Sequence, residues 1–223
     1  MPSISPKSEY QNEIAPKFKI LSTILIVSYL VGAIGLAWEQ SRPLFLQLTP
    51  LFLLFNALMV FNTEFIARNI TYWLWLIPAG LISFYLEAYG VSSGNIFGAY
   101  TYGDILGIKL AQVPLIIGLN WVMVIWGAYS FASFLTKDKI AKAFITGAAC
   151  VVFDYILEPV AIALGFWNWQ EVKVPAQNYL AWFMISFVLS FLAHYLKLKN
   201  NTNIVPLQLM LQFLLFLSLN IFI

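Results

Sequence analysis

Seven long apolar stretches follow one another along this chain of 223 residues. Each is about 20 residues long, which as a helix is enough to cross a bilayer hydrocarbon core of about 30 Å. Only helices or closed barrels satisfy their backbone hydrogen bonds in lipid, so these stretches predict transmembrane helices. The predicted fold class is all-α, a polytopic seven-transmembrane-helix bundle. We place the helices at residues 18–38, 43–62, 70–89, 111–135, 140–165, 176–196 and 204–223.

Composition excludes several classes of protein. With 61% hydrophobic and 10% charged residues, the chain is unlike a soluble globular domain. Its net charge of +2 comes from scattered Lys and Arg residues without a basic run, so nucleic-acid binding has no support. The single cysteine, Cys150, excludes an intramolecular disulfide.

The distribution of Lys and Arg predicts the orientation in the membrane. Nine of these cations lie on the amino-terminal side, in the even-numbered connections or within a few residues of them, and three, Arg42, Lys109 and Lys173, lie in the odd-numbered connections. The positive-inside rule then predicts a cytoplasmic N-terminus and a C-terminus outside. We expect a multi-pass protein of the cell (inner) membrane, with a cytoplasmic tail at residues 1–17 and a single membrane domain at 18–223.

Two acids lie one helical turn apart inside the fifth stretch, at Asp154 and Glu158. A charge inside a membrane costs a few kcal/mol or more, so such residues usually face the bundle interior and mark a functional site. Carboxylates four residues apart on a helix repel each other, which favours a proton on one of them. A protonated carboxyl is a proton donor. The alternative is a structural role, in which the acids pair with polar groups of neighbouring helices.

Other polar residues are predicted at the same depth as the acid pair. Glu87 lies near the outer end of the third stretch, and Asn120 lies about two turns inward from the outer start of the fourth. Between these stretches, residues 90–110 are rich in glycine and aromatics and predict an interfacial or re-entrant loop that covers the outer half of the bundle. The connection at residues 165–169 would close the same side. Interfacial packing without a functional role is the alternative.

Carboxylates alone would suit Mg²⁺, Ca²⁺ or Mn²⁺. The sequence has no HExxH motif, no cysteine or histidine pair and no Asp-rich run. We therefore predict no metal site and no cofactor.

Several motifs in residues 70–200 resemble, in order and spacing, the integral-membrane carotenoid biosynthesis family that includes bacterial gamma-carotene 1',2'-hydratases and archaeal bisanhydrobacterioruberin hydratases. The motifs are Phe84-Tyr85-Leu86-Glu87, Gly94, Phe97-Gly98-Ala99-Tyr100-Thr101-Tyr102, Pro114, Asn120-Trp121, Asp154-Tyr155-Ile156-Leu157-Glu158-Pro159 and Trp167-Asn168-Trp169.

The resemblance implies cofactor-free addition of water to the terminal 1,2 (1',2') double bond of an acyclic carotenoid end, which leaves a tertiary alcohol. Protonation of that alkene gives a tertiary cation, which needs an acid, a stabilising negative or aromatic environment and a held water molecule. We expect Asp154 as the proton donor and Glu158 or Glu87 as the base. The expected substrate-binding residues are Asn120, which holds the water, together with Trp121, Tyr100, Tyr102, Tyr155 and Trp167.

The expected partners are a polyene that enters sideways from the bilayer, water, membrane lipid and other carotenoid enzymes. A lycopene-type cyclase would use the same protonation and lose a proton after ring closure. A proton-coupled transporter would also bury carboxylates, but it should show internal repeats. A non-catalytic pigment-binding membrane subunit would tolerate amides in place of the acids.

Overall fold

The computed structural model describes residues 6–61, 70–171, 173–198 and 203–223, with side chains from Phe18 onward. Within this part, seven helices are long and apolar enough to cross a membrane, as the sequence predicted. The end of the second predicted stretch, residue 62, and two cations of the orientation argument, Arg68 and Lys199, lie outside the described residues. The helices are α1 (Pro6–Ala37), α2 (Arg42–Phe61), α4 (Ile70–Ser93), α5 (Ile116–Leu135), α6 (Lys139–Ala163), α7 (Ala176–Tyr195) and α8 (Ile204–Phe222).

Three helix boundaries differ from the prediction by more than two residues. Helix α1 begins at Pro6 instead of residue 18, α4 continues to Ser93 instead of residue 89, and α5 begins at Ile116 instead of residue 111. The residues before α5 form a small hairpin of β2 (Lys109–Leu110) and β3 (Val113–Pro114). Its turn residues Ala111 and Gln112 both have positive φ, 49° and 65°, as a tight hairpin turn requires. An apolar run alone does not distinguish this hairpin from a first helical turn, which is why α5 was predicted to begin five residues too early.

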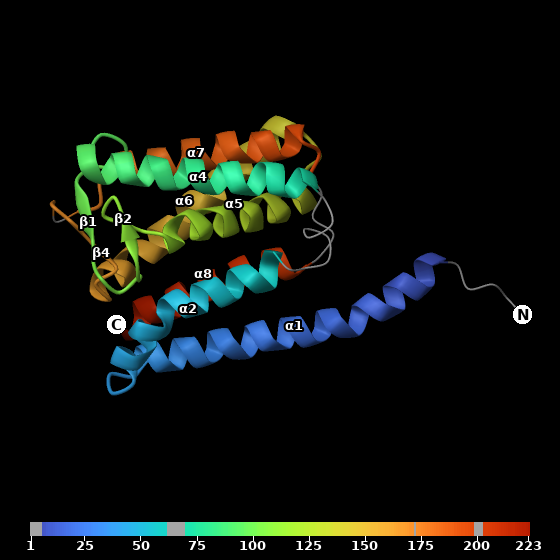
Figure 1. Ribbon diagram of the computed structural model, residues 1–223, viewed down its shortest axis with the longest axis horizontal. Helices are drawn as coiled ribbons and strands as arrows, with labels where there is room; N and C mark the ends of the chain where they lie inside the picture. Colours follow the sequence, from blue (N-terminus) through green and yellow to red (C-terminus); the bar gives the residue numbers. More distant parts are fainter. Residues whose placement is uncertain (1–5, 62–69, 172, 199–202) are drawn as a thin grey trace, which may run out of the picture.

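Helix α5 is the centre of the bundle. Of its membrane-spanning window 72% is buried, against 17–44% for the other six helices. Figure 1 shows α5 between the α4 and α7 layer on one side and the α2 and α8 layer on the other, with α1 outermost. Small residues permit close contact: a Cβ at Gly118 would lie 2.8 Å from the Gly80 carbonyl oxygen. Glycine there lets α4 and α5 approach each other.

A short two-stranded sheet lies across one end of the bundle. Strands β1 (Tyr100–Tyr102) and β4 (Trp167–Trp169) pair antiparallel, although they come from the two connections that flank α5 and α6. In Figure 1 this sheet is at the same end as the α1–α2 connection and the C-terminus. A Cβ at Gly103 would lie 2.1 Å from the Gly165 carbonyl oxygen, so the two connections meet closely there. The side of the membrane that this end faces stays a prediction.

Candidate active site

A cavity of about 40 Å³ lies where the sheet end of the bundle meets α4, α5, α6 and α7. Such a volume holds a few water molecules. Eight of the nine residues predicted for the site line it, and Tyr155 is the exception. The lining residues are Glu87, Phe97, Tyr100, Tyr102, Ile117, Asn120, Trp121, Asp154, Leu157, Glu158, Trp167, Trp169, Asn178 and Trp182.

The two strands supply the aromatic roof of this cavity. Their register pairs Tyr100 with Trp169 and Tyr102 with Trp167. Alternate residues of a strand point to opposite faces, so these four rings share the inner face, while the central residues Thr101 and Asn168 are exposed. The Tyr100 and Trp169 rings lie 4.9 Å apart between centroids. The roof therefore directs two hydroxyls and two indole N–H groups at the acids below.

Glu87, on α4, accepts hydrogen bonds through both carboxylate oxygens. The Trp121 indole donates to Oε1 at 2.7 Å, and the Tyr102 hydroxyl donates to Oε2 at 2.8 Å. The Tyr100 hydroxyl also donates to Oε2. Three donors around a carboxyl that is only 4% exposed favour its ionised form, which accepts and does not donate.

Tyr100 and Tyr102 remain protonated donors in this arrangement. Burial, and then the neighbouring Glu87 carboxylate, raise the pKa of both hydroxyls well above the ordinary tyrosine value. A phenolate next to a carboxylate in a buried site would be unfavourable on both counts. The roof therefore keeps its donors at every physiological pH.

Glu158, on α6, is held from the roof through one oxygen. The indoles of Trp167 and Trp169 donate to Oε2 at 3.0 and 2.8 Å. In the described part of the chain, Oε1 has no hydrogen-bond donor of its own, which leaves it available to a water molecule in the cavity.

Asp154 lies one turn before Glu158 and is 1% exposed. Asn178, on α7, donates to Oδ2 at 2.6 Å. Among the described residues, the other oxygen, Oδ1, has no hydrogen-bond partner although it is fully buried. A buried oxygen without a donor is better suited to carry a proton than to carry negative charge.

Asn120 reaches the cavity from α5 and belongs to a chain of amides. Gln212 donates to Asn120 Oδ1 at 3.1 Å, and Gln208 donates to Gln212 Oε1 at 2.9 Å. Gln208 also donates to the Tyr29 hydroxyl at 3.1 Å. This chain connects α8 and α1 to the acid cavity.

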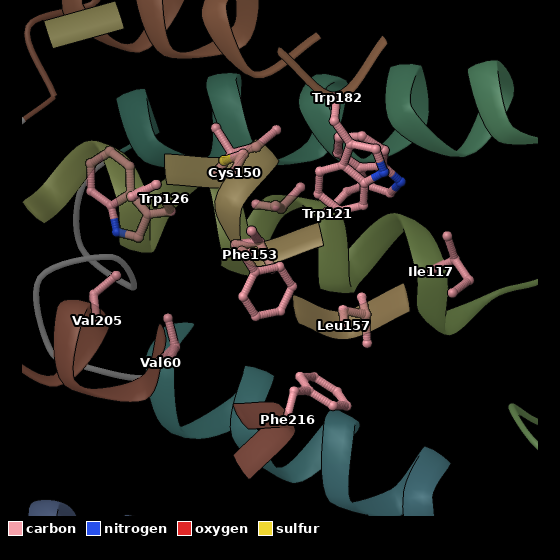
Figure 2. Close-up of a cluster of buried hydrophobic side chains, with 14 of the residues drawn as sticks. Val60, Ile117, Trp121, Trp126, Cys150, Phe153, Leu157, Trp182, Val205 and Phe216 are labelled. Atoms are coloured by element: carbon pink, nitrogen blue, oxygen red, sulfur yellow. The ribbon is translucent and has the colours of Figure 1, made fainter. Parts of the chain in front are cut away.

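Stacked indoles form one wall of the cavity. Trp121 of α5 and Trp182 of α7 have ring centroids 3.7 Å apart and an interplanar angle of 20°. Figure 2 shows the two rings overlapping, with Ile117 farther along α5 and Leu157 of α6 below them. Aromatic faces attract a cation that develops beside them.

Tyr155 is the predicted site residue that the structure places elsewhere. Its side chain is 64% exposed and points away from the cavity, because residues 154 and 155 lie about 100° apart around a helix. It lines an open groove on α6 together with Glu158 and Pro159.

Sequence reasoning missed several residues of the site. Asn178 is a buried amide in an otherwise apolar helix, and Gln208 and Gln212 are two more at helical spacing in α8, so buried amides were the available signal. Trp169 and Phe97 belong to motifs of the resemblance, but neither was given a role in the site. Trp182 carried no signal, because aromatic residues are common in every helix of this chain. Within the described residues, no three His, Cys, Asp or Glu side chains are grouped as a metal ion would require.

Comparison with known proteins finds a family and a relative that match most of this chain. A family model described as "Carotenoid biosynthesis protein" matches residues 48–223. The bisanhydrobacterioruberin hydratase of Haloarcula japonica is 30% identical over 177 residues, which cover 73% of this chain. The matched part is 60% of that hydratase, so the chain spans less than two thirds of its length. No solved structure matches the chain.

Proposed function

This chain belongs to the family of carotenoid biosynthesis proteins, and we propose that within this family it acts as a carotenoid hydratase. The proposed reaction adds water across the terminal 1,2 (1',2') double bond of an acyclic carotenoid end and gives a tertiary alcohol. The observation that carries the proposal is the contrast between three carboxyls on one small cavity. Both oxygens of Glu87 accept from donors, Glu158 accepts through Oε2 alone, and Asp154 keeps an oxygen that is fully buried without a partner in the described part of the chain.

The first step is protonation by Asp154. Its Oδ1 proton passes to C2 of the alkene, the pair of π electrons forms the new C–H bond, and a tertiary cation remains at C1. The ionised Glu87 carboxylate and the Trp121 face stabilise that cation, as fixed charges and dipoles do in a water-poor site. Tyr100, Tyr102 and Trp121 hold Glu87 in place before the charge develops.

The second step is capture by water. A water molecule held by Asn120 attacks C1, and Glu158 Oε1 takes the proton that the water loses. Glu158 is a better base than Glu87, because both oxygens of Glu87 are already engaged by donors. A proton then returns from Glu158 to Asp154 across one helical turn. The balance is one water added, and the steps require no cofactor.

We further infer that the N-terminus is cytoplasmic and the C-terminus outside, in the cell (inner) membrane, with the acids in the outer half. Association with the enzymes that supply the carotenoid remains a prediction. A reporter fused to the C-terminus should be active only outside the cytoplasm, and activity inside would overturn the orientation.

The test is pigment analysis of a bacterial host that accumulates lycopene and gamma-carotene, by chromatography and mass spectrometry. Hydration gives a product heavier by one water that is absent in Asp154→Asn. An isomer of unchanged mass would instead identify a lycopene-type cyclase. Unchanged pigments in both lycopene- and gamma-carotene-producing hosts would favour a pigment-binding subunit or a transporter.

A further inference from the structure

A second, larger cavity of about 230 Å³ lies between α1, α2 and α8. Two of its four polar side chains bond within their own helices: the Ser28 hydroxyl donates to the Leu25 carbonyl at 2.8 Å and the Thr49 hydroxyl to the Phe45 carbonyl at 2.9 Å. Aromatic rings, including the edge-to-face pair of Tyr29 and Phe52 with centroids 5.0 Å apart, supply much of the wall. The interior is therefore suited to a flat apolar chain.

This cavity opens sideways toward lipid. Val31 on α1 and Leu48 on α2 both line it, and their side chains are 50% and 41% exposed. At Gly32, an added Cβ would have no atom within 4 Å in the described part of the chain. Protein interiors are close-packed, so empty space of this size beside a helix calls for an occupant.

The wall between the two cavities is thin and partly polar. Gln212 lines the apolar cavity and donates to Asn120, which lines the acid cavity. Phe216 also lines the apolar cavity and packs against Phe153 of α6, with ring centroids 5.9 Å apart. In Figure 2, Phe216 projects from α8 toward α6, the helix that carries the acids. A molecule in the apolar cavity is thus one side-chain layer from the acids.

We propose that the cavity between α1, α2 and α8 binds the conjugated chain of the carotenoid, whose end passes Gln212 to reach the acids. The inference rests on the proposed function for the identity of the occupant. Lining residues Ser28 to Leu36 extend over about 12 Å of α1, so this cavity holds one part of the polyene and leaves the rest in the bilayer. The acid cavity is too small to hold more than water until the end displaces Gln212 from Asn120.

An open groove on α6 is the rival route, since it shares Glu158 with the acid cavity. Its lining also includes Tyr155, Tyr179 and Asn220, together with the apolar Ile156, Pro159, Ile162 and Val174. Four of its eight lining residues are therefore polar, against four of the fourteen that line the cavity between α1, α2 and α8, and this difference favours that cavity for the substrate.

The experiment fills the cavity at Gly32. Gly32→Leu adds bulk where no described atom lies, and leucine also has the better helix propensity, so we expect the variant to unfold at or above the wild-type temperature. The matched control is Ile34→Phe, which adds bulk on the same helix at a side chain that is 63% exposed to lipid. Val31→Phe, at the mouth, is a second blocking variant.

The readout is induced circular dichroism of lycopene, which is achiral when free, mixed with each purified protein in detergent. We expect a signal from wild type and Ile34→Phe, and at least a tenfold weaker affinity in Gly32→Leu and Val31→Phe. Wild-type affinity in both blocking variants would overturn the proposal, and so would a loss caused only by Ile162→Phe in the rival groove. If Gly32→Leu loses bound phospholipid but binds lycopene as wild type does, the cavity is a lipid site and the proposal is overturned as well. Binding that obeys these expectations without any hydration would support this site and refute the proposed reaction.

Discussion

Amide substitutions of the three carboxyls should differ in their effect on folding, because the donors around each carboxyl differ. Glu87 faces three donors divided between its two oxygens. In Glu87→Gln, one orientation of the amide sets its NH₂ group against the Trp121 indole, which can only donate. The other orientation sets it against Tyr100 and Tyr102, whose hydroxyl protons then lack an acceptor. Either way, at least one buried donor is left unpaired.

The size of the effect follows from that mismatch. A buried polar group without its partner costs about 1–3 kcal/mol. In a chain of this length 1 kcal/mol corresponds to about 2–4 °C, so we expect the unfolding temperature of Glu87→Gln to fall by roughly 2–12 °C.

The other two acids accept through a single oxygen, which an amide retains. In Asp154→Asn the NH₂ group can replace the proposed O–H at Oδ1. Asp154→Asn and Glu158→Gln should therefore unfold within about 2 °C of wild type, while losing a proton-transfer contribution of about 10²–10⁴ in rate.

The assay is thermal unfolding of the detergent-solubilised proteins followed by circular dichroism, with hydration measured on the same preparations. Glu39→Gln, at an exposed residue, is the control for the loss of one charge. Equal unfolding temperatures for the three amide variants would refute the assignment of Glu87 as a held carboxylate and Asp154 as the protonated acid.

Two further predictions concern the roof. Gly103→Ala should lower both the unfolding temperature and the hydration rate, because its Cβ would lie 2.1 Å from the Gly165 carbonyl oxygen. Gly32→Ala has open space around its Cβ and the better helix propensity, so it should leave the unfolding temperature unchanged or raise it. Equal effects of the two substitutions would contradict the close contact. The raised pKa of Tyr100 and Tyr102 keeps both hydroxyls protonated at a pH at which an ordinary tyrosine ionises. The tyrosinate absorbance at about pH 11 should therefore be the same in wild type and in the variant with Phe at both positions. A larger absorbance in wild type would show that the two hydroxyls ionise normally.

The membrane helices could be predicted from the sequence because each depends on one local property, a sufficiently long apolar run. The depth of Glu87, Asn120, Asp154 and Glu158 was also predictable, since helix rise converts residue number into distance along the bundle. Their lateral convergence depended on packing. It follows from the central position of α5, which brings α4, α6 and α7 together around Trp121.

The roof was harder to predict from the sequence. Tyr100-Thr101-Tyr102 and Trp167-Asn168-Trp169 both show the alternation of a strand, but each is only three residues long and they are far apart in the chain. Three-residue patterns are too short to assign, and their pairing depends on the meeting of two connections. Tyr155 lies outside the acid cavity for a simpler reason: adjacent residues on a helix face different ways, and its neighbour Asp154 faces the cavity. Its role in substrate binding stays a prediction.

The most direct test of the account follows the oxygen atom. Purified protein would be reconstituted with an acyclic carotenoid in water labelled with heavy oxygen, and the product analysed by mass spectrometry. The account predicts one heavy oxygen for each hydrated end with wild type, and none with Asp154→Asn, which should still fold. A product that lacks the label, or one isomeric with the substrate, would contradict acid-catalysed hydration at this site.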